Sequence, residues 1–309
     1  MKKVYVTKLL LVWVLPILLL LFTWILFGCY YESNDDVAIS QVIRGETALA
    51  PVADLHLYFH GLASVLATLY RIWPAIPWYG LLLYLLLYVS LVLVYQVLYD
   101  VLAGKVSVLS LACCLILIYW FAWQQTALLI NFTRLPILLA GTGILYATSQ
   151  RKHFFSLAVG LAVVMLGWCI RPSAAILGLL VAIPGAWWLA GYRAFLPVIS
   201  AGAIMAVAAG VLALTYSRSE NTRQRIDVGN AYYLDYALYQ PQPVTAADSL
   251  GVLSVANWAF GDSTVVNEQL YEQSFRFDKD LFPKQRLPRK AMSTYYMVRE
   301  HCVWFVFCL

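Results

Sequence analysis

The segment Glu32-Ser33-Asn34-Asp35-Asp36 gathers acidic side chains whose types and spacing could do chemistry. Neighbouring carboxylates can hold a divalent metal ion, and one carboxylate can act as a general base that takes the proton from an acceptor hydroxyl. A solvated acidic loop would have the same composition. Asp35 and Asp36 are therefore candidates for a catalytic pair, and for metal ligands if a divalent ion is bound.

Two arginines are candidates for binding an anion such as a phosphate. Arg171 stands at the junction of two apolar segments, and Arg134 follows Asn131 and Thr133 inside another. A guanidinium can bind phosphate in bidentate fashion. A charge inside a membrane span costs at least about 2.5 kcal/mol, so Arg134 is expected to face a cavity or a partner. Arg171 could equally be a long side chain that reaches the membrane interface without a specific ligand.

Two further pairs are candidates for contacts with a bound molecule. His56 and His60 are four residues apart, on one predicted helical stripe. Such a pair can bind metal, but the helix offers no third ligand, so interface polarity is the simpler interpretation. Trp258 could stack on a sugar ring beside Asp262, and a packed loop is the alternative interpretation of that segment.

The elements that position these residues belong to a membrane protein. Of 309 residues, 62% are hydrophobic and 12% are charged, and the mean hydropathy is +0.74. Soluble domains carry about 25% charged residues. The net charge of +5 is thus better explained by orientation of the chain in a membrane than by nucleic-acid binding, and the six cysteines are interpreted as small buried apolar residues.

Apolar stretches of about 20 residues predict an all-α, polytopic helix bundle with about seven or eight transmembrane helices and additional extracytoplasmic juxtamembrane helices. Lys2, Lys3 and Lys8 precede the first span, which predicts a cytoplasmic N-terminus. The predicted spans are 9–28, 78–100, 106–121, 127–148, 154–170, 173–191 and 194–216, and 291–309 could be part of an eighth.

The basic loops predict which polar segments lie outside. If Lys105, Lys152 and Arg193 are all cytoplasmic, residues 29–77 stay outside, and 55–73 forms an interfacial or re-entrant helix. The alternative is that 55–73 spans the membrane with its polar stripe facing a cavity. The preferred division is a transmembrane core at 1–216 with its first extracytoplasmic loop at 29–77, an extracytoplasmic polar segment at 217–290, and a partial last transmembrane helix at 291–309.

The acids that follow the first span resemble the first outer loop of the GT-C glycosyltransferases. These are multispan membrane enzymes that use polyprenyl-phosphate-linked sugars. The segment from Asn34 to Ser40, followed by Arg44-Gly45, looks like that loop. Shorter likenesses to uncharacterised bacterial members occur at 69–80, 125–126, 131–134, 167–172 and 257–262.

The resemblance implies a transferase of the cell envelope, active in polysaccharide biosynthesis, in a bacterial inner or plasma membrane. It would move a sugar from a polyprenyl-phosphate donor to an extracytoplasmic glycan, lipid or protein acceptor. Asp35 would act as the base or orient the acceptor, Asp36 would support it or help hold a metal, and Arg171 and Arg134 would bind the donor phosphate. The pairs His56/His60 and Trp258/Asp262 would contact the acceptor or the sugar. Membrane lipids are the other expected partners. The oligomeric state stays open.

One departure from the GT-C pattern keeps rival functions open. Many members carry another acid on a later outer loop, where residues 119–126 here offer only Gln124 and Gln125. The chain is also short for the family. A non-catalytic or truncated paralogue is therefore one rival, and a transporter or flippase for a lipid-linked glycan is another.

Overall fold

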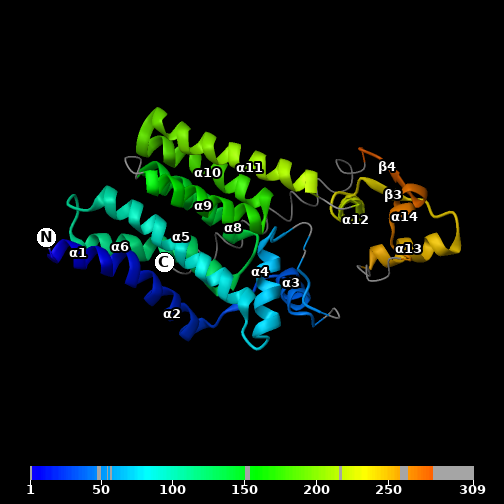
Figure 1. Ribbon diagram of the computed structural model, residues 1–309, viewed down its shortest axis with the longest axis horizontal. Coiled ribbons are helices and arrows are strands. Elements are labelled where there is room, and N and C mark those ends of the chain that lie inside the picture. The colour runs from blue at the N-terminus through cyan, green and yellow to red at the C-terminus, as the bar shows by residue number, and fades with distance from the viewer. Residues whose placement is uncertain are drawn as a thin grey trace. The chain divides into compact units, whose positions relative to one another are not determined.

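A computed structural model gives the protein a mostly helical fold (Figure 1). It describes residues 2–46, 50–53, 55, 58–149, 154–215, 218–257 and 264–280. The chain divides into two compact units, Met1–Leu214 and Thr215–Leu309. The partial span expected at 291–309 lies outside the described residues.

Within the described residues, four helical stretches are long and apolar enough to cross a membrane: Tyr5–Phe27, Trp78–Leu102, Val108–Leu128 and Pro172–Thr215. The prediction of an all-α chain with membrane-length apolar helices is thereby confirmed, whereas the predicted seven or eight spans are not. The first stretch combines α1 (Lys2–Leu9), a π-helical segment (Leu10–Val14) and α2 (Leu15–Phe27), and the second is α5 (Trp78–Leu102). The last consists of α10 (Pro172–Ala190), a 3-10 turn (Gly191–Ala194) and α11 (Phe195–Thr215).

The third stretch corrects two predicted boundaries. It contains α6 (Val108–Ile118), a π-helical segment (Tyr119–Trp123) and α7 (Gln124–Leu128), so helical structure continues past the predicted end at 121. The next helix, α8 (Arg134–Ser149), begins seven residues after the predicted start at 127. Between them Leu129–Ile130 forms strand β2, and the Asn131 side chain accepts the Arg134 amide at 3.3 Å. This side-chain cap fixes where α8 begins.

The polar segment after the first span contains two short helices. Ser33 caps α3 (Asn34–Arg44) by accepting the Asp36 amide, and α3 ends at Gly45 in the left-handed region. The second helix, α4 (Leu62–Ile72), has 11 residues. It is about half the length that a span requires and covers only part of the predicted helix 55–73.

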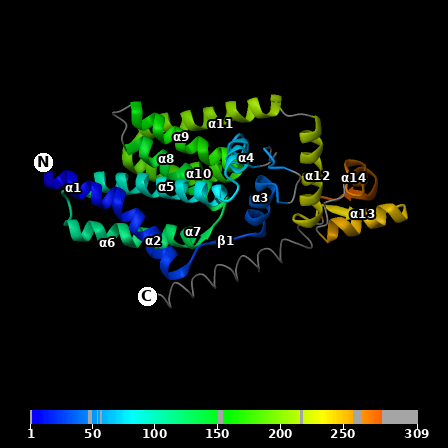
Figure 2. The ribbon, with the colours of Figure 1, turned by 60° about the horizontal axis from the view of Figure 1, so that its bottom comes forward.

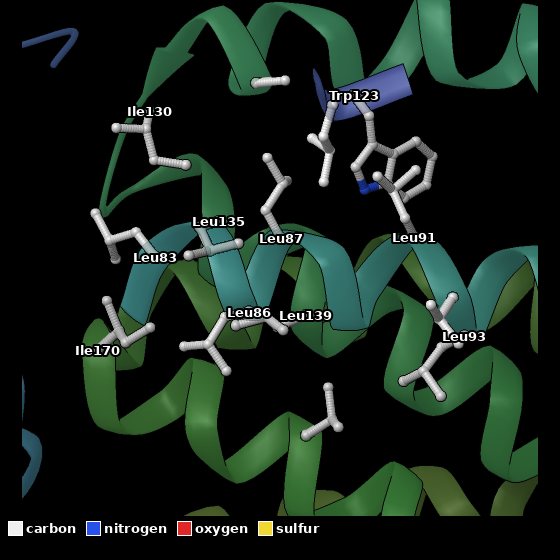
Figure 3. Close-up of a cluster of buried hydrophobic side chains, with 14 of the residues drawn as sticks. Leu83, Leu86, Leu87, Leu91, Leu93, Trp123, Ile130, Leu135, Leu139 and Ile170 are labelled. Atoms are coloured by element: carbon white, nitrogen blue, oxygen red, sulfur yellow. The ribbon is translucent and has the colours of Figure 1, made fainter. Parts of the chain in front are cut away.

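Helix α8 packs against α5, α9 (Phe154–Ile170) and α10, and the two ribbon views show them side by side (Figure 2). Glycines permit the close approach, because a Cβ on Gly143 would lie 2.7 Å from the Gly160 carbonyl oxygen of α9. Figure 3 shows where leucines of α5 meet α8 and the end of α9. The labelled side chains at this contact are Leu83, Leu86, Leu87, Leu135, Leu139 and Ile170.

The second unit has a small core of its own. It contains α12 (Arg218–Leu234), α13 (Ala246–Ala256) and α14 (Glu268–Ser274), and strand β3 (Tyr239–Pro241) pairs antiparallel with β4 (Phe275–Phe277). Thr245 and Asp248 form a capping box that starts α13. The core side chains are Val255, Val266, Leu270, Tyr271 and Phe275.

Candidate functional site

A two-residue strand pair joins the acidic loop to the start of α8. Strand β1 (Tyr30–Tyr31) pairs in parallel with β2, and the Glu32 amide donates to the Ile130 carbonyl at 3.2 Å. The pairing crosses about 100 residues of sequence. It places the segment from Glu32 to Asp36 beside the segment from Asn131 to Arg134.

Asp36 is the most deeply buried acid among the described residues, with 0% of its surface exposed. Its Oδ1 atom accepts the Tyr79 hydroxyl at 2.8 Å and the Phe132 amide at 3.1 Å. Its Oδ2 atom accepts the Ser33 hydroxyl at 2.8 Å. One carboxylate therefore ties the start of α3 to α5 and to the segment before α8.

Burial raises the pKa of the Asp36 carboxyl above its ordinary value, and the hydrogen bonds from Tyr79, Ser33 and Phe132 offset only part of that effect. A raised pKa is the expected result when desolvation of the charged form dominates. Its three donors suit an anchor that holds neighbouring segments together.

Asp35 differs from its neighbour because its side chain is exposed in the first turn of α3. The two acids predicted as a pair thus occupy different environments. Asp36 has three protein donors on its two oxygens, which does not fit a carboxylate reserved for a divalent ion. Among the residues that the structure describes, no three His, Cys, Asp or Glu side chains group as metal ligands.

Arg134 forms an ion pair with Glu32 through its Nη2 atom. The pair is partly shielded, with 34% of the Arg134 side chain and 23% of the Glu32 side chain exposed. Arg134 Nη1 and Glu32 Oε2 are both buried without a hydrogen-bond partner in the described part of the chain. Orphaned buried polar atoms are costly, and here they leave one unused donor and one unused acceptor beside the acidic loop.

Arg171 lies at the N-cap of α10, in extended backbone. Its Nη1 atom donates to the Thr133 hydroxyl, next to Arg134 in sequence. The guanidinium also lies 5.3 Å from the Tyr58 ring centre and 5.1 Å from that of Phe132. Cation–π contacts of this kind fix the guanidinium plane. Both predicted phosphate-binding arginines therefore meet at the segment from Asn131 to Arg134.

His60 lies at the same end of the helix bundle, because its amide donates to the Cys169 carbonyl at 2.8 Å. Its ring lies 5.6 Å from that of Trp168. The preceding residue, Phe59, is fully buried with a φ of 56°, a conformation that is strained for a bulky residue. His56, Trp258 and Asp262 lie outside the described residues, so their predicted contacts have no structural counterpart here.

An apolar cavity of about 250 Å³ opens beside the acidic loop, between the end of α2, strand β1 and the start of α5. Its walls are rich in aromatic rings, and burial together with nearby Tyr70 and Asp36 raises the pKa of Tyr31 to about 12. Tyr31 therefore stays protonated at neutral pH. The ring residues of the cavity are Trp24, Tyr30, Tyr31 and Tyr84.

Three residues at this site received no individual role from the sequence. Glu32 belongs to the acidic run, but only the structure pairs it with Arg134. Thr133 precedes Arg134 and meets Arg171. Tyr79 opens an apolar span, where a hydroxyl needs a partner when buried. The need for a hydrogen-bond partner was the signal in the sequence that could have pointed to Tyr79.

Comparisons of the chain with protein-family models, with curated proteins and with solved structures return no match.

Proposed function

We propose that this chain is a membrane glycosyltransferase that moves a sugar from a polyprenyl-phosphate donor to an extracytoplasmic glycan, lipid or protein acceptor. The observation that carries the proposal is the convergence of Arg134 and Arg171 at Thr133, beside the loop of Asp35 and Asp36. Within the described residues Arg134 pairs with Glu32 but keeps its Nη1 donor unused, and Asp35 is exposed on the same acidic loop. Such a transfer requires cationic groups and a carboxylate in one region.

The residues divide the transfer step between them. The Asp35 carboxylate takes the proton of the acceptor hydroxyl, whose oxygen forms a bond to the anomeric carbon of the sugar. The bond from that carbon to the phosphate oxygen breaks, and polyprenyl phosphate leaves as an anion. Arg134 and Arg171 stabilise the charge that develops on the leaving phosphate. Asp36 positions the loop through its three hydrogen bonds.

The finer membrane topology is part of the proposal. Gly191, with a φ of 58°, divides the 44-residue stretch Pro172–Thr215 into helices of 19 and 21 residues. Each is about the length of one span. Together with α8 and α9 this supports seven spans. The proposal adds a cytoplasmic N-terminus, for which the basic residues before the first span are the support. In a cysteine-depleted chain, Val37→Cys should be labelled from outside and Lys105→Cys from inside.

The test of the activity is a transfer assay on the full chain in proteoliposomes with radiolabelled polyprenyl-phosphate hexoses. Asp35→Asn should lower the transfer rate by about 100-fold or more, the usual contribution of a general base. Glu46→Gln is the matched control, because Glu46 is an acid of the same segment that pairs with Arg44 at 2.9 Å. Unchanged transfer in Asp35→Asn, with Glu46→Gln also unchanged, would remove the catalytic assignment.

A non-catalytic paralogue is the rival that has an observation of its own in favour, because Asp36 is committed to three structural hydrogen bonds. It predicts binding of the donor without transfer in the unaltered chain. A transporter or flippase has weaker support, since ionisable residues near the bilayer centre would be expected. Lys8 and Asp100 stand near span ends, where they pair at 3.5 Å.

A further inference from the structure

A hollow in the second unit, bounded by α12, α14 and β3, takes no part in the proposed transfer step. Its volume is about 400 Å³, within the range of about 300–1,000 Å³ that is typical of small-molecule sites. It combines aromatic and ionised side chains. The lining residues that carry the argument are Arg225, Gly229, Tyr239, Glu268, Tyr271 and Glu272.

The aromatic wall depends on a glycine. Gly229 of α12 is buried against the Tyr271 ring, and a Cβ at this position would lie 2.7 Å from the ring atom Cδ1. Tyr271 is 7% exposed and its hydroxyl donates to the Asn230 side chain. The Tyr239 ring, with its centre 6.3 Å from that of Tyr271, is partly exposed at the hollow. The two rings give the hollow a fixed apolar surface.

The polar side of the hollow is held by an ion pair. Arg225 binds the Glu268 carboxylate through both Nε and Nη2, so a guanidinium and a carboxylate are fixed side by side. Glu272 lies one helical turn further along α14, and its side chain is exposed. The lining thus contains two carboxylates and one guanidinium, which gives it an excess of negative charge.

We infer that this hollow binds a neutral saccharide. The C–H face of a sugar ring packs on tyrosine rings, and ionised side chains form strong hydrogen bonds with hydroxyls. The excess negative charge repels a sugar that carries a carboxylate. Identifying the saccharide as part of the acceptor glycan rests on the proposed function, whereas the class of ligand rests on the hollow itself.

The test is binding to the full chain in phosphatidylcholine nanodiscs, measured by saturation-transfer NMR and calorimetry. The probes are three neutral trisaccharides (maltotriose, cellotriose and chitotriose) and the anionic trigalacturonate. At least one neutral probe should bind, and trigalacturonate should not. Tyr239→Ala should weaken the neutral probe by about tenfold or more, equivalent to about 1.4 kcal/mol.

A charge reversal gives a second readout that leaves the core intact. Glu272→Arg turns the excess negative charge of the lining into a positive one, so trigalacturonate should begin to bind and the neutral probe should weaken. Asp280→Arg is the matched control, because it makes the same charge change at an exposed position of the second unit outside the lining. Trigalacturonate binding that appears equally in both variants would overturn the inference.

Other results separate this inference from the proposed function. Binding of no neutral probe by a chain that transfers sugar would sink the saccharide site and leave the transferase standing. Saccharide binding that survives in Asp35→Asn, together with absent transfer in the unaltered chain, would support the saccharide site and remove the proposed transferase function. Equal affinity for neutral and anionic probes would also overturn the inference.

Discussion

Replacing Asp36 separates its structural contribution from its charge. In Asp36→Ala the Tyr79 hydroxyl and the Phe132 amide lose their acceptor at fully or almost fully buried positions, 0% and 1% exposed. Each stranded donor costs about 1–3 kcal/mol, which gives about 2–6 kcal/mol for the pair. The partly exposed Ser33 hydroxyl can turn to water and adds little.

Asp36→Asn should behave very differently. The amide oxygen can occupy the place of Oδ1 and keep both buried donors, while the amide nitrogen can donate to Ser33 Oγ in place of Oδ2. The loss of stability should therefore stay within about 1 kcal/mol. Transfer activity should also be retained, because the anchor needs hydrogen-bond acceptors and not a charge.

The assay is scanning fluorimetry of the full chain in nanodiscs, followed by the transfer assay. For a unit of this size the alanine variant should melt roughly 5–20 °C lower. Ser40→Ala is the control. Ser40 is also buried in α3, but its hydroxyl donates to the Val37 carbonyl of the same helix, at 2.8 Å, and holds no other segment of the described chain. If Asp36→Ala melts at the same temperature as the unaltered chain, the role of Asp36 as a structural anchor is refuted. An asparagine variant that folds normally but loses transfer would make Asp36, not Asp35, the base.

Three further predictions concern charge and packing. Because burial raises the pKa of Asp36, its contribution favours folding below the ordinary value and is lost as pH rises through the raised value. The melting temperature of Asp36→Asn relative to the unaltered chain should therefore increase from about pH 4 to about pH 7. The destabilisations caused by Glu32→Gln and Arg134→Gln, added together, should exceed the destabilisation of the double variant by about 1–2 kcal/mol. A double-mutant cycle of melting measurements gives this coupling energy. Gly178→Ala should cost about 1–3 kcal/mol by overlap with the α8 backbone. Gly202→Ala, in the interior of α11 and facing open space, should not lower the melting temperature.

The sequence predicted the helices whose limits depend on local signals. Predicted 154–170 coincides with α9, and predicted 173–191 and 194–216 lie within one residue of α10 and α11 at each end. Hydropathy and Pro172 at the start of α10 are enough for these limits. The start of α8 was wrong, because Leu129–Ile130 is as apolar as a helix and forms strand only by pairing with Tyr30–Tyr31.

The candidate site was predictable in position but not in its division of roles. Arg171 and the acids flank apolar segments, so the order of spans predicts a common membrane face for them, whereas Arg134 was predicted to lie inside the span 127–148. Which acid is buried does not follow, since Asp35 and Asp36 are adjacent and differ only in their neighbours. The contacts of Asp36 come from Tyr79 and Phe132, which are 43 and 96 residues away. No local pattern contains that information.

The four residues from Asn131 to Arg134 connect the buried Asp36 with the transfer step proposed at the exposed Asp35. The Phe132 amide binds Asp36, the Thr133 hydroxyl binds Arg171, and the Arg134 guanidinium binds Glu32. One short segment therefore sets the spacing between the acidic loop and both cations. General-base catalysis and charge stabilisation both depend on such spacing, and a shift of about 1 Å can cost about 100-fold in rate. Asp36→Ala should consequently reduce transfer even at temperatures where the chain stays folded, while Asp36→Asn keeps the spacing and the rate.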